Sequence, residues 1–227
     1  MIELNETTAY LAGVIIGDGN VSNYVKSKKR NPFPDYRISI DISDKNYLLH
    51  LWNMFKTIVN TKAQPMKSSQ KPNTIPRLTL AIRNKEMYRF FNETLEIPKG
   101  FKSSIVFMPS RIKNSDLGIK RAFLAGYFDT DGGFRGNSLG FTSGSKKMSE
   151  DICQLFNEFG IDHRSESWVY QKYNRTFYGF NIRKHEIGRF LKMLPLQNME
   201  KLGRIRQRFP DAAVSERSNE AGLGKES

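Results

Sequence analysis

Alternating polar and apolar residues predict a β-hairpin near the start of the chain. The alternation runs through "NVSNYVK" at 20–26 and "YRISIDI" at 36–42, and a strand with one buried face arranges its side chains in this way. The polar segment between the two stretches supplies the turn. A helix is expected at 44–60, because Leu48, Leu51 and Phe55 recur at helical spacing behind Asp44, a residue type that caps helices.

The same succession of helices and strands is expected twice. In the first half, strands at 62–68 and 76–83 and a helix at 84–95 follow. The second half repeats the pattern, with elements expected at 132–136, 138–144, 145–160, 163–171, 175–183 and 184–194. With the helix that opens each half, both have the order α-β-β-α-β-β-α. We therefore predict an α+β protein whose two halves are related by a pseudo-twofold axis.

Breaks in the periodicity divide the chain into parts. The segment between the halves carries Pro98, Gly100 and Pro109 without a clear period, so it is expected to be a linker. The end of the chain has almost no large apolar side chains and is expected to be disordered. The expected parts are an N-terminal half at 1–96, the linker at 97–115, a C-terminal half at 116–208 and the tail at 209–227.

A short motif opens both halves. Residues 11–20 are "LAGVIIGDGN" and residues 124–133 are "LAGYFDTDGG", so Leu, Ala and Gly recur at the first three positions and Asp-Gly at the eighth and ninth. Small residues four apart, Gly13 and Gly17 in the first copy and Gly126 and Thr130 in the second, lie on one face of a helix and leave it flat. Two flat faces allow two helices to pack closely with their C-terminal ends together, which would make Asp18 and Asp131 neighbours.

Two neighbouring carboxylates at the negative ends of two helices repel each other and require a positive partner. Mg²⁺ takes oxygen ligands, and the helix ends also offer backbone carbonyls, so the pattern predicts a metal site. Gly19 and Gly132 suit helix C-caps with positive φ. The alternative is a pair of ordinary buried helices that end in Asp-Gly turns, and the duplication favours the metal site.

Composition indicates a polyanionic partner. The 227 residues include 36 Lys and Arg against 23 Asp and Glu, which gives a formal net charge of +13 and favours nucleic acid. Cys153 is the single cysteine, so an internal disulfide and a thiolate zinc cluster are both excluded. The start of the chain lacks the order of a signal peptide, and no apolar run is long enough to cross a bilayer, so an intracellular protein without a membrane partner is expected.

On these motifs the sequence resembles the LAGLIDADG homing endonucleases in their single-chain form, over about residues 7–208. The resemblance implies motif helices at the centre, two curved sheets forming a DNA-binding saddle, and a metal-dependent enzyme that cuts double-stranded DNA. Asp18 and Asp131 fall on the acid that binds the catalytic metal in that family, and the carbonyls of Gly17 and Thr130 on its backbone ligands. The earlier acid of the motif is Asp129 in the second copy but Ile16 in the first.

The resemblance also implies the chemistry. Family members hydrolyse both strands at a long asymmetric site and leave short 3′ overhangs, with one acid serving each scissile phosphate. Mg²⁺ is the expected ion, Mn²⁺ is expected to substitute for it, and Ca²⁺ is expected to bind without supporting cleavage. The family often places a water-organising residue near the second strand of each half, and the nearby candidates are Lys45, Lys146 and Lys147.

The faces of the sheets nominate residues that contact DNA. If Ile38 and Ile40 point to the core, their neighbours along the strand point to the groove, and the same reasoning applies to the other strands. A basic hairpin tip at 26–30 is expected to touch phosphates. The nominated residues are Ser22, Tyr24, Lys26, Lys28, Lys29, Arg30, Arg37, Ser39, Asp41, Arg77, Thr79 and Arg83 in the first half, and Arg135, Thr142, Arg175, Asn181 and Arg183 in the second.

Two other functions fit the same sequence. An intron-encoded protein of this type could bind RNA as a splicing maturase, and a relative without activity could bind DNA alone; retention of both motif acids argues against the latter. Self-splicing as an intein is not expected, since the terminal residues lack the nucleophile and asparagine that it uses. Two motifs in one chain complete the active site, so a monomer is expected. Organellar, archaeal and bacterial origins all remain open.

Overall fold

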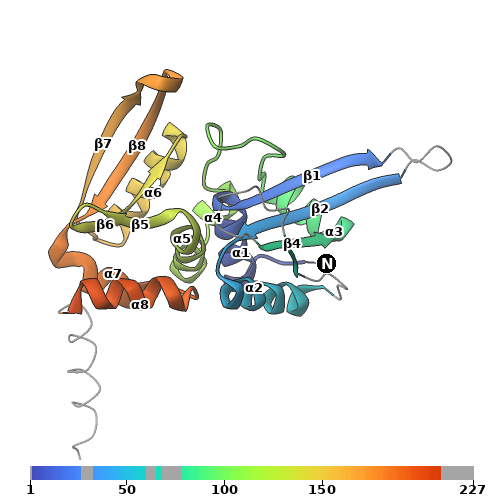
Figure 1. Ribbon diagram of the computed structural model, residues 1–227, viewed down its shortest axis with the longest axis horizontal. Coiled ribbons are helices and arrows are strands. Elements are labelled where there is room, and N and C mark those ends of the chain that lie inside the picture. Colours follow the sequence, from blue (N-terminus) through green and yellow to red (C-terminus); the bar gives the residue numbers. More distant parts are fainter. Residues whose placement is uncertain (1, 27–32, 60–64, 68–77, 211–227) are drawn as a thin grey trace, which may run out of the picture.

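The computed structural model of the protein describes residues 2–26, 33–59, 65–67 and 78–210 (Figure 1). The predicted disordered tail therefore lies, apart from its first two residues, outside the described residues. Within the described ranges, no helix is both long and apolar enough to cross a membrane.

The first half contains a four-stranded antiparallel sheet with helices on one side (Figure 1). Its strands are paired in the order β1-β2-β4-β3. The elements are α1 (Glu6–Gly17), β1 (Gly19–Lys26), β2 (Phe33–Ile42), α2 (Lys45–Ile58), β3 (Pro65–Lys67), β4 (Leu78–Arg83) and α3 (Lys85–Arg89), which continues as a π-helical turn, η1 (Phe90–Thr94).

The second half repeats this topology. Its sheet has the order β5-β6-β8-β7, again antiparallel. The elements are α5 (Leu117–Asp131), β5 (Gly132–Arg135), β6 (Ser138–Ser143), α6 (Lys146–Glu158), β7 (His163–Tyr170), η2 (Gln171–Tyr173), β8 (Arg175–Ile182), η3 (Lys184–Glu186) and α7 (Ile187–Met193). The predicted α+β fold with two matching halves is confirmed.

Local sequence explains where the helices begin. Asp44 accepts hydrogen bonds from the backbone amides of Asn46 and Tyr47 at the start of α2, as predicted, and Asn5 forms a capping box with Thr8 at the start of α1. Each cap satisfies amides that have no partner inside the helix. The apolar faces of these helices then cover their sheets, so that Leu48 and Leu51 are buried.

The two motif helices pack against each other at the centre of the molecule. The helix α1 is buried from Thr8 to Ile16, and α5 from Ala122 to Asp129. A Cβ added to Gly13 would lie 2.6 Å from the backbone nitrogen of Tyr127, and one added to Gly126 would collide with the backbone carbonyl of Tyr10. The predicted flat faces therefore exist, and only glycine permits this backbone approach.

The prediction that Gly19 and Gly132 adopt positive φ is wrong. Gly132 has φ −76°, and Gly19 is not among the positive-φ residues. Both are needed for space instead: a Cβ on Gly19 would lie 2.6 Å from Cα of Ile15, and one on Gly132 would enter the ring of Phe128. The chain thus leaves each helix directly in extended conformation, without a left-handed turn.

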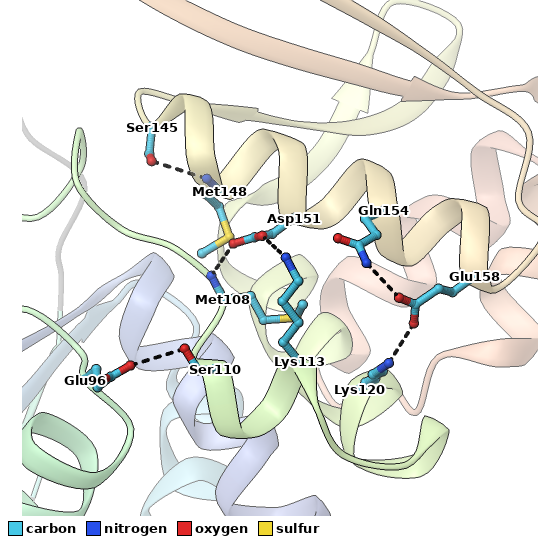
Figure 2. A network of polar contacts seen from close by, with 10 residues as sticks. All are labelled: Glu96, Met108, Ser110, Lys113, Lys120, Ser145, Met148, Asp151, Gln154 and Glu158. Carbon is cyan, nitrogen blue, oxygen red and sulfur yellow. Dashed lines mark hydrogen bonds and ion pairs between the residues drawn. The ribbon is translucent and has the colours of Figure 1, made fainter.

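Two helices were not predicted. The linker contains α4 (Ser110–Lys113), and α8 (Met199–Arg208) follows the last helix of the second half. The linker is also fixed by polar contacts with α6 (Figure 2): Asp151 accepts from the backbone amide of Met108 at 3.0 Å and from Nζ of Lys113 at 2.8 Å. Its second part therefore belongs to the packed surface of the C-terminal half.

Candidate active site

The C-terminal ends of α1 and α5 bring the two motif acids together. Asp18 caps α1, with its amide donating to the carbonyl of Val14 at 3.1 Å, and Asp131 is the last residue of α5. A Cβ on Gly17 would lie 2.7 Å from Cβ of Thr130 and 3.4 Å from Cγ of Asp131. The helix ends are thus in contact.

The electrostatics of this pair agree with the predicted repulsion. Burial, and then the negative charge of Asp18, raise the pKa of Asp131 to about 6. Part of the Asp131 residue is exposed, yet its carboxyl is crowded by the protein atoms around it. The ammonium groups of Lys102 and Lys201 and a hydrogen bond with Tyr127 oppose the rise. A second negative charge in this position is unfavourable without a nearby cation.

Two lysines that the sequence did not nominate stand at these helix ends. Nζ of Lys102 donates to the carbonyls of Gly17 at 3.3 Å and Gly19 at 2.7 Å. Nζ of Lys201 donates to the carbonyls of Thr130 at 3.1 Å and Gly132 at 2.7 Å, and also to that of Phe128. Gly17 and Thr130 are equivalent in the repeated motif, and so are Gly19 and Gly132. The two ammonium groups therefore occupy matching positions.

Burial lowers the pKa of both lysines, while the acids raise it. The pKa of Lys201 falls to about 8, and that of Lys102 is also lowered. Lys102 feels the charges of Asp131 and Asp18, and Lys201 those of Asp129, Asp18 and Asp131. The two lysines and the three acids therefore interact electrostatically with one another.

Asp129 anchors the segment that carries Lys201. Its Oδ2 accepts from the hydroxyl of Tyr10 at 2.6 Å and from the backbone amides of Gln197 at 2.7 Å and Asn198 at 3.1 Å. Asn198 in turn caps α8 by accepting from the amide of Lys201 at 3.0 Å. Burial raises the pKa of Asp129, while these hydrogen bonds lower it.

The donor set suits a hard divalent cation. Among the described residues, no three His, Cys, Asp or Glu side chains are grouped as metal ligands. A cation here would take Asp18, Asp131 and the carbonyls of Gly17 and Thr130, with its remaining ligands from water or a bound phosphate. In this structure the two carbonyls accept from the lysines, whose positive charge partly compensates the acids.

The lysines nominated from the sequence lie elsewhere. Lys45 is exposed at the start of α2. Lys146 begins α6 and pairs with Glu150 at 3.5 Å, and Nζ of Lys147 is 4.9 Å from the ring of Phe107. The role proposed for these three remains a prediction, whereas the hydrogen bonds to the motif helices are made by Lys102 and Lys201.

The outer face of the first sheet is polar, as the alternation predicted. Ile38, Ile40 and Ile42 are buried. On the other face Asp35 holds two arginines: Nη2 of Arg37 lies 3.2 Å and Nε of Arg83 lies 3.1 Å from its carboxylate. The other nominated residues on this face are Ser22, Ser39, Asp41 and Thr79, with a hydrogen bond from Thr79 to Asp41.

Arg135 is the centre of the corresponding face of the second sheet. Its Nε donates to Oδ1 of Asn181 at 2.7 Å, it contacts Thr142, and it pairs with Glu166 at 2.5 Å. Its guanidinium also lies 5.1 Å from the ring centre of Trp168. Three nominated residues, from three strands, thus form one network.

The remaining nominated residues lie in β1, in or just after β8, or outside the described part of the chain. Arg183 lies just beyond β8, 3.8 Å from Asp162, and Arg175 begins β8. Tyr24 and Lys26 lie in β1. Those outside the described residues are Lys28, Lys29, Arg30 and Arg77.

Comparisons with known proteins agree with this fold. Residues 118–195 match the family described as LAGLIDADG-like domain. The fold is similar to the homing endonuclease I-DmoI in complex with DNA and Mn, with a TM-score of 0.65 and 19% identity, covering 85% of this chain and 97% of that one. It is also similar to the homing endonuclease I-WcaI bound to its DNA recognition sequence, with a TM-score of 0.56 and 17% identity, covering 92% and 88%.

Residues 118–195 therefore carry a LAGLIDADG-like domain, and the fold of the whole chain is similar to that of these two homing endonucleases. The similarity also extends to a curated sequence. The replication factor C small subunit of Methanocaldococcus jannaschii is 26% identical over 210 residues, which is 92% of this chain and 10% of that protein. This chain therefore spans about a tenth of the length of that relative.

Proposed function

We propose that this protein is a metal-dependent endonuclease that cuts double-stranded DNA at a specific site. The observation that carries the proposal is the meeting of Asp18 and Asp131 at the ends of two packed helices, each beside a lysine. Carboxylates that are held together against their repulsion favour a divalent cation. The basic net charge and the arginine-bearing sheet faces provide for a polyanionic substrate.

The cation and the chain's own residues would share the chemistry. A divalent cation held between the acids would polarise a phosphodiester, lower the pKa of a bound water and stabilise the leaving oxygen. Lys102 and Lys201 would place fixed positive charge beside each scissile phosphate, where it stabilises the charge that develops during hydrolysis. Asp129 and Tyr10 are buried and would maintain the position of the helix ends.

The proposal extends to the cleavage products, the recognition of bases and the oligomeric state. Each motif acid would serve one strand, so that two nicks leave short 3′ overhangs in a long asymmetric site. The nominated residues of the two sheet faces would read the major groove, where every base pair presents a distinct pattern. One chain would act as a monomer, and a dimer in sedimentation velocity at working concentration would contradict this.

Mg²⁺ is the ion that we propose. I-DmoI and its variants form complexes with DNA in the presence of Mg, Mn or Ca, and oxygen donors of the kind found here bind all three. We expect Mn²⁺ to replace Mg²⁺ in cleavage and Ca²⁺ to bind without supporting it.

The test is selection of cleaved sites from a randomised DNA library with Mg²⁺, followed by assays of the wild type, Asp18→Asn and Asp131→Asn on the selected site. The wild type should cut both strands, and each variant should bind the site but lose cleavage of at least one strand. Binding of DNA without cleavage by all three proteins, in Mg²⁺ and Mn²⁺, would overturn the proposal in favour of a DNA-binding protein. Preferential binding of structured RNA would favour a maturase.

A further inference from the structure

The segment that carries Lys102 contacts both halves of the molecule. On the side of the first half, Lys99 forms a β-bridge with Val21, and the amide of Gly100 donates to the carbonyl of Val21 at 3.1 Å. Lys102 then reaches the end of α1 through the carbonyls of Gly17 and Gly19. This segment has no regular secondary structure, so contacts with neighbouring elements must fix its position.

Arg175, at the start of β8, makes those contacts from the second half. Its Nη2 donates to Oγ of Ser103 at 2.8 Å, and its guanidinium carbon lies 5.6 Å from the ring centre of Phe101. The two residues it touches therefore flank Lys102 in the chain. The guanidinium also lies 5.3 Å from the ring centre of Phe177 in the same strand, which limits its own freedom.

Gly144 lies beside the contact between Arg175 and Ser103. A Cβ at Gly144 would collide with Nη2 of Arg175 and would lie 2.8 Å from the carbonyl of Ser103. Phe101 is 76% exposed, and its ring contacts the guanidinium of Arg175. Further along, Oγ of Ser145 donates to the carbonyl of Val106 at 2.5 Å, and Asp151 holds Met108 (Figure 2). The segment is thus held on both sides of Lys102.

We propose that Arg175 is a positioning residue that holds Lys102 at the end of α1, and that it couples recognition of DNA by the second sheet to cleavage chemistry at the first motif helix. This inference rests on the proposed endonuclease function. Arg175 pairs directly with Tyr170 in the neighbouring strand, and Phe177 pairs with Trp168, so these four residues share one face of the sheet. An arginine has five donors, and Ser103 uses one. The others remain to bind a phosphate, which would hold the guanidinium and hence the segment more firmly.

The consequence is an asymmetric effect on the two strands. Lys201 does not depend on this segment, because it is carried by α8. Loss of the Arg175 contacts should therefore misplace one ammonium group and leave the other in position. Small misplacements of a catalytic group are costly in rate.

The test measures nicking of each strand separately, with enzyme in excess over a duplex labelled at both ends. Arg175→Ala should slow one strand about tenfold more than the other, and Phe101→Ala should show the same bias. The double variant Arg175→Ala with Phe101→Ala should be no slower than the slower single variant, because both act through one contact. Arg164→Ala is the matched control, since it removes an exposed arginine from β7 on the same face; it should weaken binding without bias between strands.

Amide hydrogen exchange provides a readout that needs no cleavage. Peptides covering 99–106 should exchange faster in Arg175→Ala than in the wild type or in Arg164→Ala, and bound DNA should slow exchange there in the wild type. Equal slowing of both strands, or unchanged exchange in Arg175→Ala, would overturn the inference and leave Arg175 as a plain DNA contact. If the wild type cuts no site, the proposed function fails, and exchange alone then decides whether Arg175 holds the segment.

Discussion

The two halves place a lysine at the same position by different means. Lys201 lies in the first turn of α8, with Asn198 as the helix cap. Lys102 lies in a segment without regular structure, held partly by Arg175 of the other half. Both nevertheless donate to the equivalent carbonyls of their motif helices. The site therefore requires an ammonium group at a given place rather than a repeated element to carry it.

A second difference lies inside the motif helices. Asp129 in the second copy accepts three hydrogen bonds in the interior, whereas its counterpart Ile16 is part of the apolar core. The acid fixes the chain just before α8, whereas Lys102 lies in a described segment without regular secondary structure. The two copies therefore differ at this position because their lysines are carried differently. In the second half Asp129 holds the start of α8, which carries Lys201, and in the first half Ile16 has no such task.

The largest expected effect is on cleavage by Lys102→Met and Lys201→Met. Each change removes a positive charge beside the motif acids, buried at Lys102 and half-buried at Lys201, but keeps the length of the side chain. We expect each variant to cut at least one strand roughly a hundredfold to a thousandfold more slowly, as when a preorganised charge-stabilising donor is lost. Single-turnover nicking of each strand measures this.

Lys99→Met is the control for that experiment, because it removes the same charge three residues away, where the ammonium contacts Asn23 at 3.3 Å. Its cleavage rate at saturating enzyme should stay close to that of the wild type. Wild-type rates in Lys102→Met but not in Lys201→Met would show that the halves are not equivalent in function.

Asp129→Ile, which makes the second copy like the first, should destabilise the fold. Tyr10 and the amides of Gln197 and Asn198 would lose their acceptor in the interior, and unsatisfied buried donors cost about 1–3 kcal/mol each. We expect a total loss of about 3 kcal/mol in urea unfolding, and a smaller loss for Asp129→Asn, which keeps an acceptor. A loss well below about 1 kcal/mol would mean that the acid does not stabilise this region.

Gly126→Ala should test the close approach of the two helices. The added Cβ would meet the backbone carbonyl of Tyr10, which cannot move without shifting α1. Overpacking of this kind costs about 1–3 kcal/mol. Gly133→Ala is the matched control, since nothing lies within 4 Å of its Cβ, and its unfolding free energy should change little.

The smallest effect concerns pH and Asp131. Its pKa in the folded protein is about 6, above the ordinary value of 3.8, so the folded state retains a proton that the unfolded chain loses between about pH 4 and pH 6. Stability therefore falls as pH rises through that interval. Without divalent metal, Asp131→Asn should raise Tm at pH 7 by about 2–4 °C, the shift for about 1 kcal/mol after allowance for partial exposure.

The gain in Tm should disappear near pH 4, where the wild-type carboxyl is protonated in both states. Glu150→Gln removes an exposed carboxylate from α6 and should show no comparable gain at pH 7. A constant difference between Asp131→Asn and wild type from pH 4 to pH 8 would contradict the assigned pKa.

The sequence was sufficient for the strands and the motif helices because their patterns are local. Ile38 and Ile40 alternate with polar residues, and the repeated Leu-Ala-Gly and Asp-Gly pairs predict two alike helices with acids at their ends. A signal for α8 was also present, since Asn198 precedes an acidic first turn and Leu202 and Ile205 lie three residues apart. That signal is short. Two apolar residues are too few to distinguish a packed helix from an exposed one.

The order of the elements, the faces of the strands and the pairing of Asp18 with Asp131 thus follow from local patterns in the chain. Which lysines join the two acids follows only from the way the chain packs. Lys102 and Lys201 are two of 36 basic residues, and neither stands in a pattern that sets it apart. Their role depends on contacts with carbonyls more than 65 residues away in the chain, and such contacts arise only when the helices, the linker and α8 pack together.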